Sequence, residues 1–216
     1  MKCILEFKAV FVCYSDGRTQ FMLDSTIQAE IGKNKDKPQG LTKKQRAAQY
    51  TKERADVEKV NVRKSEMMES KIVNVIRIIR RAITEGIRFD YLLVDSWYPC
   101  AELFRFIHSR HFKCNLIDMA KMGVTKYDTA VGRLSAHDII NKLVKSKSVK
   151  YARSIGYHYA SIKASYAGLD IMLFFYRRGH GSWNALISTD TNIDAKKAFR
   201  LYSRRWVIEV AHKKMK

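Results

Sequence analysis

Near the end of the chain, one predicted helix places a carboxylate among two cations and a phenol. The four residues are Tyr202, Arg205, Glu209 and Lys216. At about 100° per residue they project within a stripe roughly 60° wide. A carboxylate with cationic neighbours stays ionised, as a metal ligand must, and the cations can hold phosphate groups beside the metal. The alternative is a row of ordinary salt bridges on a surface helix. Because Phe199 and Trp206 flank the stripe, we expect this helix face to pack against the domain.

A second carboxylate, Asp95, directly follows the apolar run 91–94. Such a run predicts a strand that is covered on both faces. In open α/β sheets, ligands gather beyond the carboxyl ends of the strands. A carboxylate at that place must be solvated, paired or bound to a metal, because burying it alone is costly. The alternative is a solvent-exposed aspartate that begins the next turn.

The chain is strongly basic. Its 216 residues include 41 Lys and Arg against 21 Asp and Glu, a formal charge of +20. Such an excess favours a polyanionic partner, with nucleic acid first and an anionic membrane surface or ribosomal RNA as rivals. Most of the excess lies in residues 33–64, 141–158 and 196–216. No apolar run approaches the roughly 18–20 residues that span a bilayer, so we expect no membrane protein. The start of the chain reads as a strand, not a signal peptide, which predicts a cytoplasmic location.

The first half of the chain predicts an α/β architecture. Residues 3–23 read as a hairpin that turns at Asp16 and Gly17. An apolar stripe that begins at Glu69 predicts a helix, and Gly86 marks its end. A strand, a helix and a strand are then expected at 91–94, 99–108 and 112–117.

The second half is predicted to be rich in β structure. A short helix is expected at 135–145, a hairpin of two strands at 157–166 and 169–176, and a last strand at 183–188. Asp194 is the expected N-cap of a final helix that runs at least to Lys213. We therefore expect a core at 1–118 with a basic excursion at 30–66, a β-rich insertion at 119–182, and a last strand and glutamate-bearing helix at 183–216.

Several blocks of this sequence resemble a known family. The block YSRRWVIEVAHKKMK at 202–216 fits the pattern Tyr-x2-Arg-x3-Glu-x6-Lys. This pattern resembles the signature of one branch of DDE transposases from bacterial insertion sequences, the insertion sequence 4 type. The segment LLVDSWY at 92–98 is similar to the block around the second catalytic aspartate of the family. ISTD, 187–190, resembles the strand that leads into the signature helix of the family. VCYSDGRTQFMLD, 12–24, is more weakly similar to its early hairpin.

The resemblance implies a fold and a chemistry. The fold would be a ribonuclease-H-like mixed sheet with flanking helices and a β-rich insertion before the glutamate helix. Catalysis in this family uses three carboxylates and two divalent ions, Mg²⁺ or Mn²⁺, to cleave and join double-stranded DNA at transposon ends and targets. By position, Asp95 and Glu209 would be catalytic metal ligands, and Tyr202, Arg205 and Lys216 would contact DNA. The family also implies a homodimer and a place on the bacterial nucleoid.

One part of the family pattern is missing. The first catalytic aspartate of the family lies on a strand before the hairpin, and this chain begins almost in the hairpin. Asp16 reads as turn chemistry and Asp24 as a strand-end acid, so neither is favoured as a replacement. We therefore expect a truncated catalytic-domain fragment that lacks the first strand, tends to aggregate and is inactive alone in strand transfer. The alternatives are a non-catalytic basic DNA-binding remnant and, less favoured, an RNA-binding protein.

Overall fold

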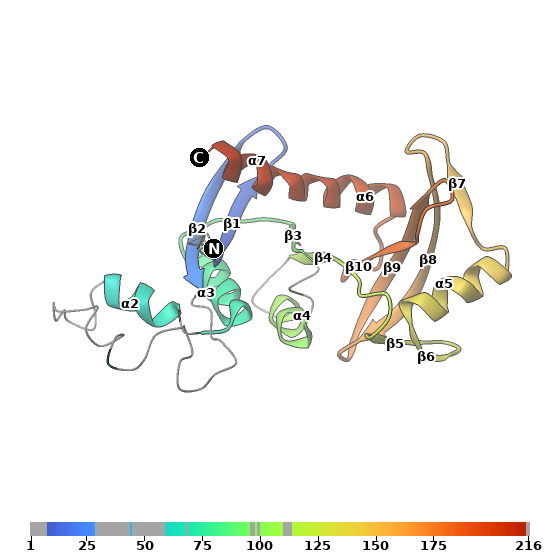
Figure 1. The fold of residues 1–216 in the computed structure, drawn as a ribbon, viewed down its shortest axis with the longest axis horizontal. Coiled ribbons are helices and arrows are strands. Elements are labelled where there is room, and N and C mark those ends of the chain that lie inside the picture. The colour runs from blue at the N-terminus through green and yellow to red at the C-terminus, as the bar shows by residue number, and fades with distance from the viewer. Residues whose placement is uncertain are drawn as a thin grey trace, which may run out of the picture. The chain divides into compact units, whose positions relative to one another are not determined.

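The computed structural model describes residues 8–28, 44, 59–67, 69–95, 98, 100–109 and 114–214. The chain divides into two compact units, Met1–Gly86 with Lys214–Lys216, and Ile87–Lys213, which we call the first and second units. Figure 1 shows the helices and strands of each. The architecture is mixed α/β, in agreement with the α/β class that the sequence predicts.

The first unit begins with the predicted hairpin. Strands β1 (Lys8–Ser15) and β2 (Gln20–Gln28) pair antiparallel. The Asp16 carboxylate accepts hydrogen bonds from the backbone N–H groups of Arg18 and Thr19, at 2.7 and 2.6 Å. Gly17 adopts a φ of 94°, which a residue with a side chain rarely takes. The Asp16 carboxylate therefore stabilises the turn of the hairpin, as the sequence predicts.

Two helices complete the described part of the first unit, α2 (Lys59–Glu66) and α3 (Lys71–Thr84). Ser70 caps α3, and the predicted apolar stripe supplies its buried face, which includes Ile79 at 1% exposure. Gly86 follows the helix with a φ of 87°, as expected for its C-terminal end. Most of the basic excursion 30–66 lies outside the described residues.

A network of ion pairs joins the hairpin to these helices. The buried carboxylate of Glu66 lies 2.6 Å from Arg81 and 3.1 Å from Arg63. Both arginines also contact Asp24 at 2.7 Å. Burial raises the pKa of Asp24, but the hydrogen bond from Arg63 and the charges of both arginines outweigh it and hold the pKa below its ordinary value. The Asp24 carboxylate thus forms its ion pairs within the first unit.

The second unit is built on one twisted sheet. Its strands, in spatial order, are β3 (Tyr91–Leu93), β4 (Asn115–Met119), β10 (Asn184–Ser188), β9 (Leu169–Arg178), β8 (Tyr157–Tyr166), β5 (Lys126–Thr129) and β6 (Gly132–Ser135). A further strand, β7 (Lys150–Ala152), pairs with β8. Strands β3 and β4 run parallel, and the other described pairs are antiparallel. The strands of segment 119–182 thus share a sheet with β3, β4 and β10.

Most elements of the second unit lie where the sequence predicts them. Helices α4 (Ala101–His108) and α5 (Ala136–Lys145) lie within the predicted ranges. The hairpin β8–β9 turns at Ala167 and Gly168, which both take positive φ values, 54° and 81°. Strand β4 is shifted from the predicted 112–117 and runs two residues further, so it includes Asp118.

The predicted last helix is broken into three pieces. Helix α6 (Ala195–Ser203) is followed by a 3₁₀ turn, η1 (Arg204–Trp206), and by α7 (Val207–Lys214). Asp194 caps α6 as predicted, accepting from the N–H of Lys197 at 2.9 Å. The Ser203 hydroxyl donates to the carbonyl of Arg200 at 2.7 Å. This bond competes with the backbone ladder and accounts for the tightened turn.

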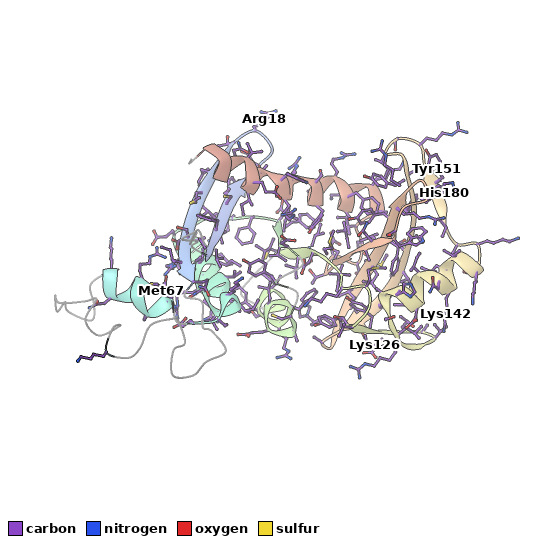
Figure 2. The ribbon with its side chains drawn as sticks, viewed as in Figure 1. Arg18, Met67, Lys126, Lys142, Tyr151 and His180 are labelled. Atoms are coloured by element: carbon purple, nitrogen blue, oxygen red, sulfur yellow. The ribbon has the colours of Figure 1, made fainter. Side chains whose placement is uncertain are left out.

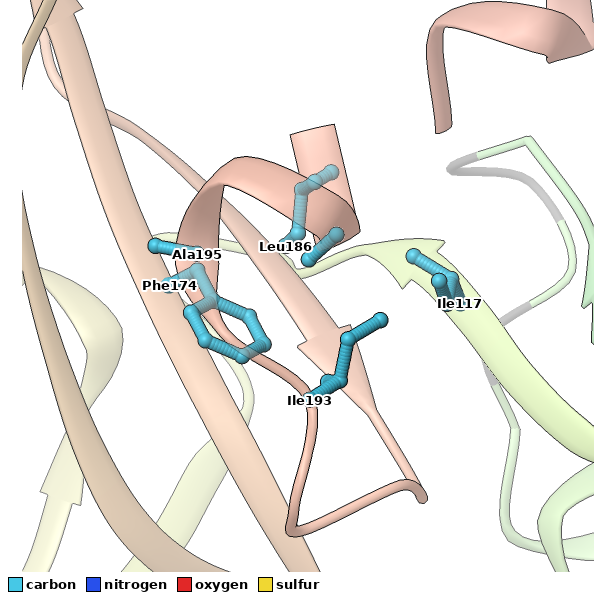
Figure 3. Close-up of a cluster of buried hydrophobic side chains, with 6 residues drawn as sticks. Ile117, Phe174, Leu186, Ile193 and Ala195 are labelled. Carbon is cyan, nitrogen blue, oxygen red and sulfur yellow. The ribbon is translucent and has the colours of Figure 1, made fainter. Parts of the chain in front are cut away.

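Helix α6 packs on the sheet through a compact apolar cluster. The cluster consists of Ile117, Phe174, Leu186, Ile193, Ala195 and Ala198. Figure 3 shows the Phe174 ring beside Ile193 and Ala195. Phe199 packs edge-on against Phe174, whereas Trp206 is 59% exposed. The helix face that was expected to pack against the domain therefore does so at Phe199 but not at Trp206, which lies in the 3₁₀ turn.

Candidate functional site

The guanidinium of Arg205 lies between the two carboxylates that the sequence analysis singles out. Its Nη2 donates to Glu209 Oε1 at 3.3 Å, and its Nη1 is 3.8 Å from Asp95 Oδ2. All three residues belong to the second unit. The fold therefore brings together a strand-end aspartate and a helical glutamate that are far apart in the sequence.

Two contacts position Asp95 at the end of β3. The N–H of Val94 donates to the carbonyl of Ile117, which extends the parallel pairing by one residue. The carbonyl of Asp95 accepts from the N–H of Tyr98 at 2.9 Å, so the chain turns directly after the carboxylate. At the other end of β3, the Tyr91 hydroxyl donates to Asp190 at 2.6 Å. This short strand is thus fixed at both ends.

Tyr202 links α6 to the same strand end. Its hydroxyl donates to the carbonyl of Val94 at 3.2 Å. Its ring lies 5.8 Å from the guanidinium carbon of Arg205. Burial, helped by the charges of Asp118 and Asp95, raises the pKa of Tyr202 above its ordinary value, so the hydroxyl remains a donor. In this structure Tyr202 positions Arg205 and the end of β3.

The two carboxylates of the site are more exposed to solvent than the arginine between them. Asp95 and Glu209 have 46% and 38% of their side-chain surface exposed, whereas Arg205 has 21%. Glu209 lies in the first turn of α7, where the helix dipole favours a negative charge. Lys216, the last residue of the predicted stripe, lies outside the described residues.

Asp95 and Glu209 are the residues of this site that could hold a divalent metal ion. Mg²⁺ is commonly held by one or two carboxylates together with substrate phosphates and water. Asp95 and Glu209 supply two such carboxylates around one cationic position. Over the part of the chain that the structure describes, no three acidic, histidine or cysteine side chains gather closely enough to hold a metal. Within the described residues, phosphate and water would supply the remaining ligands.

Asp118 is a buried carboxylate that the sequence analysis did not single out. It lies on β4 at 0% exposure, and its Oδ2 has no hydrogen-bond partner among the described residues. Its neighbour Ile117 packs with the α6 cluster, so alternation along the strand turns Asp118 to the opposite face of the sheet. In the sequence, Asp118 could have been found only as a single acid within a mostly apolar segment.

The ionisation of Asp118 predicts a pH-dependent stability. Burial, with a smaller contribution from the charge of Asp95, raises its pKa well above the ordinary 3.8. The folded state then holds this proton more tightly than the unfolded state, so the carboxyl group costs stability as the pH rises above about 3.8. We expect Asp118→Asn to remove this loss and to be the more stable protein at pH 7.

Urea unfolding between pH 4 and pH 7 measures this difference. A buried polar group without a partner costs about 1–3 kcal/mol, which sets the expected scale at pH 7. The matched control is Asp170→Asn, because Asp170 is exposed on β9. A difference between wild type and Asp118→Asn that stays constant with pH would contradict the assignment.

A separate basic surface lies on α5, β7 and the connections beside them. Its residues, all exposed, are Lys142, Lys145, Lys147, Lys150 and Arg153. Figure 2 marks Lys142 and Tyr151 on this part of the second unit. Tyr151 is 55% exposed, and its ring lies 4.9 Å from that of His158. Exposed cations beside aromatic rings suit a nucleic-acid backbone and its bases.

No helix in the described parts of the chain is both long enough and apolar enough to cross a membrane. Comparisons with family models, with curated proteins and with solved structures find no match to this chain.

Proposed function

We propose that the second unit carries part of a metal-dependent DNA-processing site of the DDE transposase type. The observation that carries the proposal is the meeting of Asp95 and Glu209 at Arg205. The mixed sheet supports a ribonuclease-H-like core, since the aspartate follows a strand of a parallel pair and the glutamate follows a helix that packs on the sheet. The basic charge of the chain supports double-stranded DNA as the substrate.

Each residue has a separate task in this proposal. Asp95 and Glu209 would hold Mg²⁺ or Mn²⁺, which when bound activates a water or hydroxyl nucleophile and stabilises the phosphate oxygens. Arg205 neutralises the two carboxylates and offers donors to a DNA phosphate. Tyr202 holds the end of β3 against α6 through Val94. Lys216 would add a phosphate contact, as the family resemblance implies.

The second candidate is a DNA-binding protein without catalysis. The exposed cations of residues 142–153 favour it, because they need no carboxylate to bind DNA. The two candidates differ in whether Asp95 and Glu209 bind metal. An RNA-binding protein is less favoured, since RNA binding needs no carboxylate pair around an arginine.

Metal binding tests the leading candidate. We expect Asp95→Asn and Glu209→Gln each to weaken Mn²⁺ binding by about tenfold or more, since loss of even an outer-shell partner costs 10–100-fold. Each removes a negative charge, so DNA affinity should stay the same or rise slightly. Electron paramagnetic resonance of free Mn²⁺ measures the first effect, and fluorescence anisotropy of a labelled duplex measures the second.

Asp170→Asn serves as the control, because it removes an exposed acid from β9 and should leave Mn²⁺ binding unchanged. If Asp95→Asn and Glu209→Gln also bind Mn²⁺ like the wild type, the metal site is refuted. Retained DNA affinity would then leave the non-catalytic candidate.

A further inference from the structure

Arg205 is held less tightly than the arginines of the ion-pair network in the first unit. Its two ion-pair distances are 3.3 and 3.8 Å. In the first unit, Arg63 and Arg81 approach their carboxylates to 2.7 and 2.6 Å. Tight pairs of this kind measure about 2.7–2.9 Å. The same chemistry therefore forms closer pairs elsewhere in the protein, and Arg205 spans two carboxylates without closing fully on either.

Arg205 also keeps donors for another partner. A guanidinium has five N–H donors. Within the described residues, Nη2 donates to Glu209, whereas the buried Nε has no hydrogen-bond partner. Phosphate oxygens match the fork of guanidinium donors in pairs. A phosphate that approaches this site can therefore offer Arg205 a better set of bonds than Asp95 and Glu209 do.

The same position matters for a divalent cation. A metal held by both Asp95 and Glu209 needs the space and the negative charge that Arg205 occupies and neutralises. Two cations in that space would repel each other strongly at a partly buried site. Metal binding must therefore displace the guanidinium or be weakened by it.

We propose that Arg205 is an internal counter-ion that DNA phosphate draws away, which couples DNA binding to metal binding. The inference rests on the proposed function and adds the order of binding, with DNA before the metal. Without DNA, Arg205 neutralises Asp95 and Glu209 and keeps their metal affinity low. A bound phosphate takes over the guanidinium, and the freed carboxylates bind the metal more tightly. By linkage, the metal must strengthen DNA binding by the same factor.

The test is a Mn²⁺ titration of the full chain, followed by electron paramagnetic resonance, without and with a short DNA duplex. Without DNA, we expect Arg205→Gln to bind Mn²⁺ at least fivefold more tightly than the wild type, the lower limit of common coupling between sites. With DNA, the wild type should gain at least fivefold. Arg205→Gln should gain less, because its gain comes from phosphate ligands alone and not from release of the two carboxylates. Arg205→Lys, which keeps the charge without the fork, should fall between them.

Two controls make the result specific. Arg204→Gln removes the same charge from the adjacent, exposed residue and should behave like the wild type. The double variant Asp95→Asn/Glu209→Gln measures the Mn²⁺ that the duplex binds by itself, which is subtracted. Circular dichroism confirms that the variants are folded.

The outcomes separate this inference from the proposed function. If wild type and Arg205→Gln bind Mn²⁺ equally through Asp95 and Glu209, with equal gains from DNA, the counter-ion role is overturned and the metal site stands. If no variant binds more Mn²⁺ than the double variant, both proposals fail. Weaker binding by Arg205→Gln without DNA would assign Arg205 a supporting role and would also overturn the counter-ion role.

Discussion

Replacing Phe174 with Ala is expected to lower the free energy of unfolding of the second unit by about 3–5 kcal/mol. Phe174 is 1% exposed and belongs to the cluster that joins α6 to the sheet. Removing its ring leaves a cavity in this cluster and takes away the edge-on contact with Phe199. Helix α6 carries Tyr202, so its anchoring also sets the geometry around Arg205.

Tryptophan fluorescence during urea unfolding measures this effect selectively. All three tryptophans of the chain belong to residues 87–213, so the signal reports the second unit. The control is Val124→Ala, because Val124 is 90% exposed, and a change within about 0.5 kcal/mol is expected there. A loss below 1 kcal/mol for Phe174→Ala would show that α6 does not depend on this cluster.

The second large effect is the dependence of DNA binding on salt. If the five exposed cations between Lys142 and Arg153 each neutralise one phosphate, the slope of log affinity against log salt is about −4.5. Raising salt from 50 to 200 mM then lowers the affinity about 500-fold. We expect Lys142→Gln/Lys145→Gln/Lys147→Gln to make the slope shallower by about 2.7.

Anisotropy of a labelled duplex at four or more salt concentrations gives these slopes. The matched control is Lys126→Gln/Arg133→Gln, since these cations already face Asp138 and Asp128 at 3.7 and 3.8 Å. In this control, the slope of log affinity against log salt should change less for each charge that is removed. A flat salt dependence of the wild type would refute DNA binding through phosphate contacts, and with it both candidate functions.

Local chemistry explains which parts of the fold the sequence could predict. The turn at Asp16, the cap at Asp194 and the hairpin at Ala167 and Gly168 each depend on residues within a few positions of one another. The apolar stripe of α3 is likewise visible within one helix. Such features need no knowledge of distant partners, and the structure confirms them.

The wrong predictions of element bounds and burial come from interactions that compete with the local sequence pattern and cannot be read from it. Strand β4 continues to Met119 because β10 pairs with it across Leu186. The last helix is interrupted because a side-chain hydroxyl, that of Ser203, bonds to the backbone. Trp206 has the character of a core residue but lies in the 3₁₀ turn and is 59% exposed. Each outcome depends on neighbours that are distant or only weakly encoded.

The sequence selected residues of the candidate site but not their arrangement. Residue types and spacing selected Asp95, Glu209, Arg205 and Tyr202. The link between Asp95 and Arg205 depends on how α6 lies on the sheet, which only tertiary packing decides. The hydrogen bond from Tyr202 to Val94 has the same origin and joins residues 108 positions apart. Asp118 was missed because a lone acid in an apolar segment has no pattern of its own.

The 3₁₀ turn between α6 and α7 sets the rotation of α7 about the helix axis. A residue advances about 120° around the axis of a 3₁₀ helix and about 100° around that of an α-helix. Changing the three residues Arg204–Trp206 from one form to the other would therefore turn α7 by about 60°. Ala195 and Ala198 would keep α6 on the sheet, and the exposed Trp206 could turn without leaving a cavity. The direction in which Glu209 points is thus set by the pitch of one short turn, while the core stays as it is.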